Sequence, residues 1–355
     1  MRELPLESPS KMTETPIRIP GTKLAKTDVH LAMQGSQNDP RFGAGIRIFS
    51  GSSSPNLAKE ISEYLNLSLG RYEKYIFSNE NLFFKLNESV RGQDVYLIQS
   101  CASPIHDHIM EMLLLLDTIK RDFAWRTTIV VPYLTYTRSD KKDQPRVGIA
   151  ARLLAEMIEV AGADRYMTID LHAGQIQGFF HIPGDTLTAF HLLCDYVKAQ
   201  QYPNLVVVAT DLGFAKKTRN WAESLNTPMA IVEKRRIDNA DQPHALSIIG
   251  DVRGKNVLLV DDELVTGGSV ASAVHTVREH GARDIYLAFT HPVFAPGSMQ
   301  RLADLEIKEI ITTNTLEVAP ERLLPNMTVL SIAPLLGEVI RRSHEGRSVG
   351  ELFNE

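Results

Sequence analysis

Short runs of β-branched and other apolar residues alternate with helical patterns along the chain from Gly45 onward. Alternation of this kind indicates parallel sheets that helices cover on both faces. The expected strands lie at residues 46–49, 95–99, 128–131, 166–169, 205–209, 230–232, 257–260, 285–289, 310–313 and 329–332. The expected helices lie at residues 106–121, 147–161, 186–199, 270–280 and 333–342.

These strands are too many for one open sheet in a chain of this length. At 355 residues the chain has room for about two domains of ordinary size. We therefore predict an α/β fold with two successive domains, at residues 43–184 and 185–355, and a boundary near residues 183–185. Residues 1–42 are rich in Pro, Ser, Thr, Lys, Gln and Gly without lasting periodicity, so we expect a flexible tail there.

Composition excludes several classes of protein. The net charge of −5 argues against a dedicated nucleic-acid binder. No apolar run approaches the ~18 residues that a membrane span needs, and the first residues lack the apolar stretch of a secretory signal. The two cysteines, Cys101 and Cys194, do not have metal-ligand spacing. We expect a cytoplasmic protein with no nucleic-acid partner and no membrane partner.

The segment NVLLVDDELVTGGS at residues 256–269 is the most specific in the chain. An apolar strand ends at Asp261 and Asp262, and a loop with the sequence TGGS leads into a helix. Glycines let backbone N–H groups approach phosphate oxygens, and the helix N-terminus adds donors and a favourable dipole. The two carboxylates would accept hydrogen bonds from ribose hydroxyls. The alternative is an ordinary helix start, in which the acids cap the helix and the glycines form the turn.

This segment resembles the 5-phosphoribosyl-binding motif of type I phosphoribosyltransferases and of ribose-phosphate pyrophosphokinases, the synthetases of phosphoribosyl pyrophosphate (PRPP). Other segments favour the second family. DLHAGQIQGFF at residues 170–180 resembles its signature, and PYLTYTRSDKK at 132–142 resembles a second motif. EKRR at 233–236 resembles its catalytic loop, and FSNEN at 77–81 its first ATP-contact segment. The resemblance runs in one order from about residue 45 to residue 353, so the N-terminal tail is an extension to a divergent member.

The resemblance implies two tandem type I phosphoribosyltransferase-like domains. It also implies a reaction in which the pyrophosphoryl group of Mg-ATP passes to the 1-hydroxyl of ribose 5-phosphate, giving PRPP and AMP. Catalysis of such a transfer rests on positioning, cations and magnesium, because charge builds up on oxygens that are already negative. Mg²⁺ is therefore the implied cofactor, and ATP and ribose 5-phosphate are the implied substrates.

The resemblance assigns roles to individual residues. Lys234 and Arg236 are the implied cations of the catalytic loop, and His172 is the implied contact to the metal–ATP complex. Asp170 and Asp211 are the implied carboxylates at the metal, with a helix cap as the alternative role for Asp211. The implied ATP-binding residues are Phe77, Asn79, Asn81, Arg138, Ser139 and Asp140. The implied residues for ribose 5-phosphate are Asp261, Asp262, Val265, Thr266, Gly267, Gly268 and Ser269.

Several positions depart from the family pattern. The family has a carboxylate where this chain has Asn81, and often a glycine where it has Glu80. Val265 stands where the family has the last Asp of its DDxxDTGGT loop, which removes one acceptor for a sugar hydroxyl. Further changes occur at Ser139, Gly174, Phe214 and Ser269. The transfer machinery is therefore expected to be intact, while the specificity contacts differ.

We therefore expect an active pyrophosphokinase. Two alternatives stay open: a non-catalytic regulatory paralogue that assembles with a true synthetase, and a pyrophosphokinase for another sugar phosphate. A phosphoribosyltransferase is disfavoured, because the ATP-side segments would have no purpose in it. The family forms hexamers built from dimers, so the resemblance also implies a homo-oligomer, with a paralogous subunit as a further option.

Overall fold

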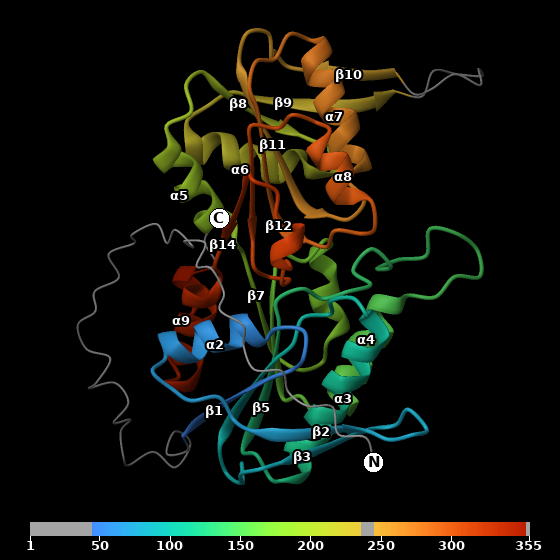
Figure 1. Ribbon diagram of the computed structural model, residues 1–355, viewed down its shortest axis with the longest axis vertical. Helices are drawn as coiled ribbons and strands as arrows, with labels where there is room; N and C mark the ends of the chain where they lie inside the picture. The colour runs from blue at the N-terminus through green and yellow to red at the C-terminus, as the bar shows by residue number, and fades with distance from the viewer. Residues whose placement is uncertain (1–44, 236–244, 353–355) are drawn as a thin grey trace.

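A computed structural model describes residues 45–235 and 245–352 (Figure 1). Within these ranges the strands form a five-stranded sheet, a seven-stranded sheet and a separate two-stranded hairpin. The five-stranded sheet lies in the lower half of Figure 1 and the seven-stranded sheet in the upper half. Helices flank both larger sheets, as the alternation of strand and helix patterns predicts.

The first sheet has the order β1-β4-β5-β6-β7, and its pairs are parallel. Its strands are β1 (Ile46–Ser50), β4 (Asp94–Ile98), β5 (Arg126–Val131), β6 (Arg165–Ile169) and β7 (Gly184–Leu187). The accompanying helices are α2 (Pro55–Tyr64), α3 (Ile105–Arg121), α4 (Ala150–Val160) and the 3₁₀ helix η1 (Gly174–Phe179). Strand β4 is buried at every position, which explains its nearly continuous apolar sequence.

The edge strand β7 corrects the sequence prediction. A helix is predicted from residue 186, whereas Gly184–Leu187 pairs in parallel with β6 and the next helix, α5, begins at Phe190. The domain boundary predicted at residues 183–185 therefore overlaps the start of a strand of the first sheet. The segment has four residues and no apolar alternation, so its conformation depends on the pairing with β6 rather than on local preference.

The hairpin is a second feature that the sequence does not predict. Strands β2 (Tyr72–Ile76) and β3 (Leu82–Leu86) pair antiparallel at the lower end of the molecule in Figure 1. In the connecting turn the Phe77 carbonyl accepts a hydrogen bond from the Glu80 N–H at 2.9 Å. The Phe77 N–H donates to the Asn81 carbonyl at 3.0 Å. The segment expected to contact ATP is thus the tip of a hairpin.

The second sheet has the order β10-β9-β8-β11-β12-β13-β14, in which β9 and β10 are antiparallel and the other pairs parallel. Its strands are β8 (Leu205–Ala209), β9 (Met229–Arg235), β10 (Ala245–Ile249), β11 (Asn256–Leu264), β12 (Ile285–Pro292), β13 (Glu309–Thr313) and β14 (Met327–Leu330). The helices here are α5 (Phe190–Gln200), α6 (Ala215–Leu225), α7 (Gly268–Glu279) and α8 (Ser298–Ala303), with short 3₁₀ helices η2 (Leu212–Phe214) and η3 (Pro320–Arg322).

Strand β11 is longer than the sequence predicts. The apolar pattern ends at residue 260, but parallel pairing with β12 continues to Leu264 opposite Pro292. The acidic residues at 261–263 therefore lie within the strand and not in the loop after it. Because side chains alternate along a strand, neighbouring acids in β11 face different surroundings.

The C-terminal helix α9 (Ala333–His344) follows the second sheet in sequence but lies beside α2 in the lower half of the molecule (Figure 1). A 3₁₀ helix, η4 (Gly350–Leu352), follows it. Leu336 of α9 belongs to the same buried apolar cluster as Ile61 of α2 and Val207 of β8. One continuous core thus joins both sheets.

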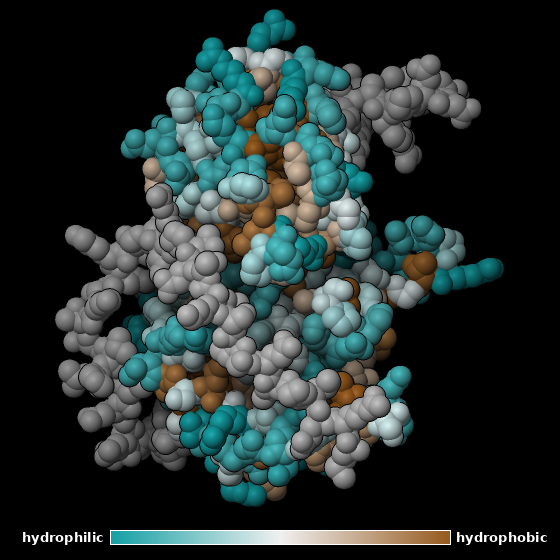
Figure 2. Space-filling model, viewed as in Figure 1, coloured by the Kyte–Doolittle hydropathy of each residue, from teal (hydrophilic) through white to brown (hydrophobic). Residues whose placement is uncertain are grey.

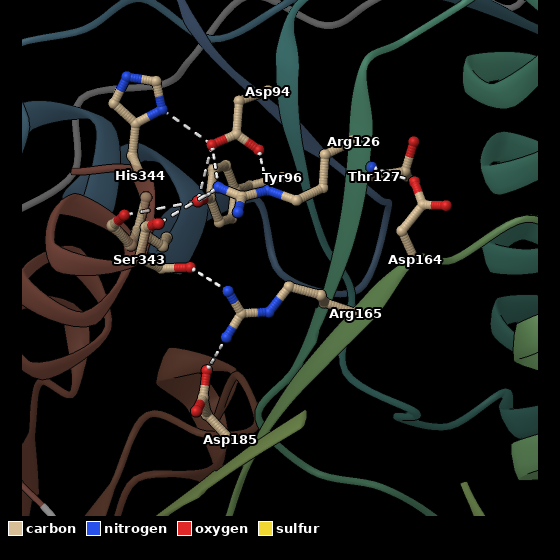
Figure 3. Close-up of polar contacts among 10 residues, drawn as sticks. Asp94, Tyr96, Arg126, Thr127, Asp164, Arg165, Asp185, Ser343 and His344 are labelled. Carbon is tan, nitrogen blue, oxygen red and sulfur yellow. Dashed lines mark hydrogen bonds and ion pairs between the residues drawn. The ribbon is translucent and has the colours of Figure 1, made fainter. Parts of the chain in front are cut away.

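Polar contacts fasten α9 to the first sheet (Figure 3). Arg126 of β5 donates to both carboxylate oxygens of the fully buried Asp94, at 2.8 and 2.5 Å. Nδ1 of His344 lies 2.8 Å from the same carboxylate. Arg165 of β6 donates to the hydroxyl of Ser343 at 2.9 Å. Burial alone would raise the pKa of Asp94, but the hydrogen bonds from His344 and Arg126 outweigh burial and lower it.

The visible face in Figure 2 is mostly hydrophilic, and one of its brown areas lies over the middle of the upper half. Within the described ranges, every helix is too short or too polar to cross a membrane.

Candidate active site

Two strand ends from different sheets meet in this protein. Asp170 and His172 follow β6 of the first sheet, whereas Asp262 lies in β11 of the second. Nδ1 of His172 lies 2.8 Å from Oδ2 of Asp262. Ligands of open α/β sheets bind beyond the carboxyl ends of the strands. This junction is therefore where a substrate is expected.

The charges at this junction depend on contact between the two halves. The hydrogen bond that His172 donates to Asp262 raises the pKa of His172. Burial alone would raise the pKa of Asp262, but the hydrogen bond and charge of His172 outweigh burial and lower it. Burial, followed by repulsion from Asp262, raises the pKa of Asp261, although the Thr210 hydroxyl donates to Asp261 at 2.8 Å. Two adjacent carboxylates thus differ in how readily they hold a proton.

Contacts from both sheets hold the turn that contains Asp170. Asp170 has a left-handed backbone with φ of 41°. Its Oδ2 accepts hydrogen bonds from the Ala189 N–H at 3.0 Å and from the Thr290 hydroxyl at 2.7 Å. Aspartate visits this conformation more easily than most residues, and strain of this kind clusters at functional sites.

An open hollow adjoins the acidic residues. Its lining includes the carboxylates of Asp170, Asp261 and Asp262, together with Lys217 and Trp221 of α6. The sequence prediction did not include the two α6 residues. Their spacing of four places them on one face of the helix that follows β8, and β8 is the neighbour of β11. The spacing of four, in the helix that follows a neighbour of β11, is the sequence signal that points to Lys217 and Trp221.

Glu263 is a further residue that the sequence does not predict, and it binds two residues from the first half of the chain. Its carboxylate accepts a hydrogen bond from the Tyr133 hydroxyl at 3.1 Å and forms an ion pair with Nε of Arg138. Burial alone would lower the pKa of Arg138, but Glu263 outweighs burial and raises it. The Arg138 side chain is 60% exposed, so the ion pair leaves part of the guanidinium accessible. Arg138 is therefore placed within the same junction as His172.

The loop after β11 joins the strand directly to the N-terminus of α7. Gly267 has φ of 73°, a conformation that favours glycine. The carbonyl of Val265 accepts a hydrogen bond from the Ala295 N–H at 2.8 Å, which braces the loop. The first N–H groups of a helix have no partner within it, so those of α7 can donate to an anion. This geometry is compatible with the phosphate site that the sequence predicts.

Comparisons with known proteins agree with this geometry. A family model described as the N-terminal domain of ribose phosphate pyrophosphokinase matches residues 46–162, and one described as the phosphoribosyl synthetase-associated domain matches residues 236–354. A ribose-phosphate pyrophosphokinase of Nostoc sp. is 42% identical over 309 residues, which cover 87% of this chain and 93% of the relative. The chain belongs to the ribose-phosphate pyrophosphokinase family.

Two further relatives extend the similarity over both sheets. A ribose-phosphate pyrophosphokinase described as chloroplastic, from Arabidopsis thaliana, is 40% identical over 316 residues, 88% of this chain and 78% of the relative. The crystal structure of phosphoribosylpyrophosphate synthetase from Mycobacterium smegmatis has a TM-score of 0.81 and 39% identity, covering 85% of this chain and 99% of that chain. The predicted family and fold class, with tandem phosphoribosyltransferase-like domains, are confirmed.

Some residues that the ribose-phosphate pyrophosphokinase family implies lie away from this junction. Phe77, Asn79 and Asn81 are all exposed in the hairpin turn. In Figure 1 the hairpin lies at the lower end of the molecule, whereas β11 and α7 lie in the upper half. Within one chain the hairpin turn thus lies away from β11 and α7. Their role in binding ATP stays a prediction.

Two of three other positions on the nucleotide side make hydrogen bonds within the chain. The Ser139 hydroxyl accepts a hydrogen bond from the Ala150 N–H at 3.2 Å, at the start of α4. The buried Asp140 accepts a hydrogen bond from the side chain of Gln175 in η1. Gly174 is the first residue of η1. These contacts shape the loops on either side of His172.

The remaining predicted residues lie in the second half. Asp211 accepts a hydrogen bond from the Phe214 N–H at 3.1 Å and caps η2, which is the alternative role considered for it. Lys234 lies in β9, where its backbone pairs with Leu246. Arg236 lies outside the described residues. The metal and catalytic roles of these three residues stay predictions.

Among the described residues, no group of three or more His, Cys, Asp or Glu side chains is arranged to hold a metal ion by itself. Mg²⁺ usually retains several waters and takes one or two carboxylates together with substrate phosphates, so it needs no such cluster. The oxygen donors of Asp170, Asp261 and Asp262 line one hollow and are of the type that Mg²⁺ prefers. The chain can therefore accommodate Mg²⁺ beside a bound phosphate.

Proposed function

We propose that this chain transfers the pyrophosphoryl group of Mg-ATP to the 1-hydroxyl of ribose 5-phosphate, giving PRPP and AMP. This makes it a ribose-phosphate diphosphokinase, a transferase of nucleotide biosynthesis, acting in the cytoplasm. The observation that carries the proposal is the contact between His172 of the first half and Asp262 of the second, 2.8 Å apart, next to the phosphate loop. The names of the relatives, at about 40% identity, agree with it.

Ribose 5-phosphate is placed on the second sheet in this proposal. Its phosphate accepts hydrogen bonds from the N–H groups at the start of α7 and from the hydroxyls of Thr266 and Ser269. Asp262 keeps its negative charge because of His172 and accepts hydrogen bonds from the ribose hydroxyls. Asp261 has a raised pKa, so it can hold a proton and can both donate and accept a hydrogen bond. The 1-hydroxyl then points toward the junction with the first sheet.

The nucleotide is placed between this junction and the hairpin tip of a neighbouring subunit. Arg138 and His172 contact the consecutive acids Glu263 and Asp262 of β11. In this proposal both bind the same phosphates, and Arg138 uses the N–H groups that Glu263 leaves accessible. Lys234 and Arg236 supply positive charge to the transferred group, as a point charge and a planar fork respectively. Asp170, Asp211 and His172 are the residues that the family resemblance implies for Mg²⁺; together with substrate phosphates they would hold the ion, which would supply positive charge to the triphosphate.

The hairpin tip reaches the nucleotide of a neighbouring subunit if the protein assembles. Its exposed apolar side chains are Tyr75, Ile76, Phe77 and Phe83, with exposed fractions of 48%, 65%, 53% and 44%. A patch of exposed apolar side chains on the surface of a soluble protein marks a contact site. We infer a homo-oligomer, with a hexamer built from dimers as the expected form, in which Phe77, Asn79 and Asn81 bind the adenine of the adjacent subunit.

The alternative that a specific observation favours is a pyrophosphokinase whose substrate is a different sugar phosphate. Val265 supplies no carboxylate to the sugar, whereas Lys217 and Trp221 add a cation and an aromatic ring to the hollow beside Asp261. A sugar phosphate with a different hydroxyl pattern or an added negative group would use these contacts.

The deciding experiment is ³¹P NMR of the purified protein with Mg²⁺, ATP and ribose 5-phosphate. Resonances of AMP and PRPP appearing together establish the reaction.

Lys234→Ala should lower turnover by about 10³-fold, because a charge-stabilising cation is lost at the transferring group. The matched control is Lys255→Ala, which removes a lysine bonded to Asp251 on the surface. If the wild-type protein is folded but forms no AMP and PRPP, the proposal is contradicted. A panel of sugar phosphates then tests whether the substrate is a different sugar phosphate.

A further inference from the structure

His291 is a buried histidine at the site to which none of the preceding roles has been given. It lies near the end of β12, where its backbone is the partner of Glu263 in β11. Its side chain is nearly inaccessible, with the residue 3% exposed. The ring packs against Tyr133 of the first half, with ring centroids 5.0 Å apart. His291 therefore belongs to the second sheet but is enclosed by residues of both.

The hydrogen bonds of Nε2 in His291 cross between the sheets. Its Nε2 lies 3.2 Å from the carbonyl of Ile169 and 3.2 Å from the carbonyl of Asp170. Carbonyl oxygens are acceptors, so Nε2 carries the proton and donates to the end of β6. Nδ1 lies 3.0 Å from the hydroxyl of Thr315, which can donate to it. Burial lowers the pKa of His291 and favours this neutral form.

The two acceptors belong to the turn that places Asp170 and His172. Asp170 has φ of 41°, so its carbonyl is turned out of the regular strand direction. The neighbouring Thr290 donates to the Asp170 carboxylate at 2.7 Å. Consecutive residues of β12 thus hold both the backbone and the side chain of Asp170.

We propose that His291 is a positioning residue for phosphoryl transfer, which fixes the turn at 169–172 through Nε2 and thereby sets His172 against Asp262. This inference rests on the proposed function of that junction. Substrate bound on α7 touches the second sheet, whereas His172 belongs to the first. Loss of the Nε2 donor therefore impairs the transfer step more than the binding of ribose 5-phosphate.

Two amide variants separate this role from simple filling of the core. In H291Q the amide nitrogen of the longer side chain reaches the position of Nε2 and retains the donor. In H291N the shorter side chain reaches the position of Nδ1, toward Thr315, and leaves the two carbonyls without this donor. Both variants bury a neutral amide of similar polarity, so they are a matched pair.

We expect H291N to lower kcat by ~10- to 100-fold, because a misplaced group at a reacting centre costs about this much. The KM for ribose 5-phosphate should stay within about twofold, since its contacts lie on the second sheet. H291Q should recover most of the loss. Hydrogen–deuterium exchange of the peptide that contains residues 169–173 should become faster in H291N and return toward the wild-type rate in H291Q.

Equal effects of the two variants on kcat and on exchange overturn the proposal, as does a loss that follows thermal stability and KM alike. If the wild-type chain shows no turnover, the proposed function fails separately. The exchange rates of 169–173 then decide the role of His291 by themselves: faster exchange in H291N than in H291Q supports it, and equal rates contradict it.

Discussion

At the scale of single residues, the two neighbouring aspartates of β11 show how surroundings separate identical side chains. His172 donates to Asp262 and lowers its pKa, whereas burial and repulsion raise that of Asp261. The difference requires the contact between the two sheets, because His172 comes from the first. A pair of carboxylates with different proton affinities can both accept and donate hydrogen bonds at one sugar.

Val265 is the position where a residue change is expected to alter sugar binding. Val265→Asp should tighten the binding of ribose 5-phosphate by about tenfold, because one added charge-assisted hydrogen bond is worth ~1.5 kcal/mol or more. Isothermal titration measures the dissociation constant. Val265→Asn, with the same shape and no charge, is the control. An unchanged constant in the aspartate variant would mean that this side chain does not touch the sugar.

Glu80 is a residue whose backbone conformation opposes its side chain. It has φ of 65° in the turn between β2 and β3, at the position after a tight turn where hairpins favour glycine. Glu80→Gly should raise the free energy of unfolding by ~0.5–1 kcal/mol, because relief of strain exceeds the entropy that glycine loses.

Glu80→Ala is the matched comparison, since alanine keeps the Cβ that causes the strain. Denaturation with urea measures both variants. Equal stabilities would show that the turn relaxes around any side chain at this position.

At the scale of elements, the β2–β3 hairpin carries the apolar surface that we assign to subunit contact. Ile76→Asp should shift the protein toward smaller species in sedimentation velocity, because a charge would be buried at that contact. Val160→Asp is the control, since Val160 of α4 is 88% exposed and lies outside the hairpin. If both variants assemble like the wild type, the hairpin does not mediate the contact.

Pairing between elements also decided where strands begin and end. The apolar run at 257–260 predicts a strand, and its neighbour β12 extends that strand to Leu264. Residues 184–187 have no strand pattern, yet they pair in parallel with β6 and form the edge strand of the first sheet. A strand pattern reports burial of side chains, whereas backbone pairing adds residues that the pattern does not mark.

At the scale of the whole molecule, α9 closes the fold by returning to the first sheet (Figure 3). Asp94 is its buried anchor, and hydrogen bonds from His344 and Arg126 outweigh burial and lower its pKa. A lowered pKa contributes stability above the unfolded value of about 3.9, and this contribution is lost as the pH falls through the folded value. The contact between α9 and the first sheet is therefore acid-sensitive below pH ~4.

Asp94→Asn should lower the free energy of unfolding at pH 7 by about 3 kcal/mol, because Arg126 loses its charged partner in a buried position. The difference from the wild type should shrink as the pH falls below ~4. Urea unfolding across this pH range measures it. Asp117→Asn, which breaks an exposed pair with Arg121 in α3, is the control and should change stability by less than about 1 kcal/mol. A difference that stays constant with pH would contradict the role of the Asp94 carboxylate.

The sequence by itself determined the alternation of strands and helices, the family, and the loop that follows β11. These features depend on local order, since apolar periodicity, glycine in a tight loop and the order of motifs can be recognised along the chain. The tertiary structure alone decided that His172 meets Asp262, that Arg138 meets Glu263, and that His291 holds the turn after β6. The partners in these contacts are separated by about 90 to 125 positions. Their contact depends on how the two sheets pack around one core, and no local pattern records that packing.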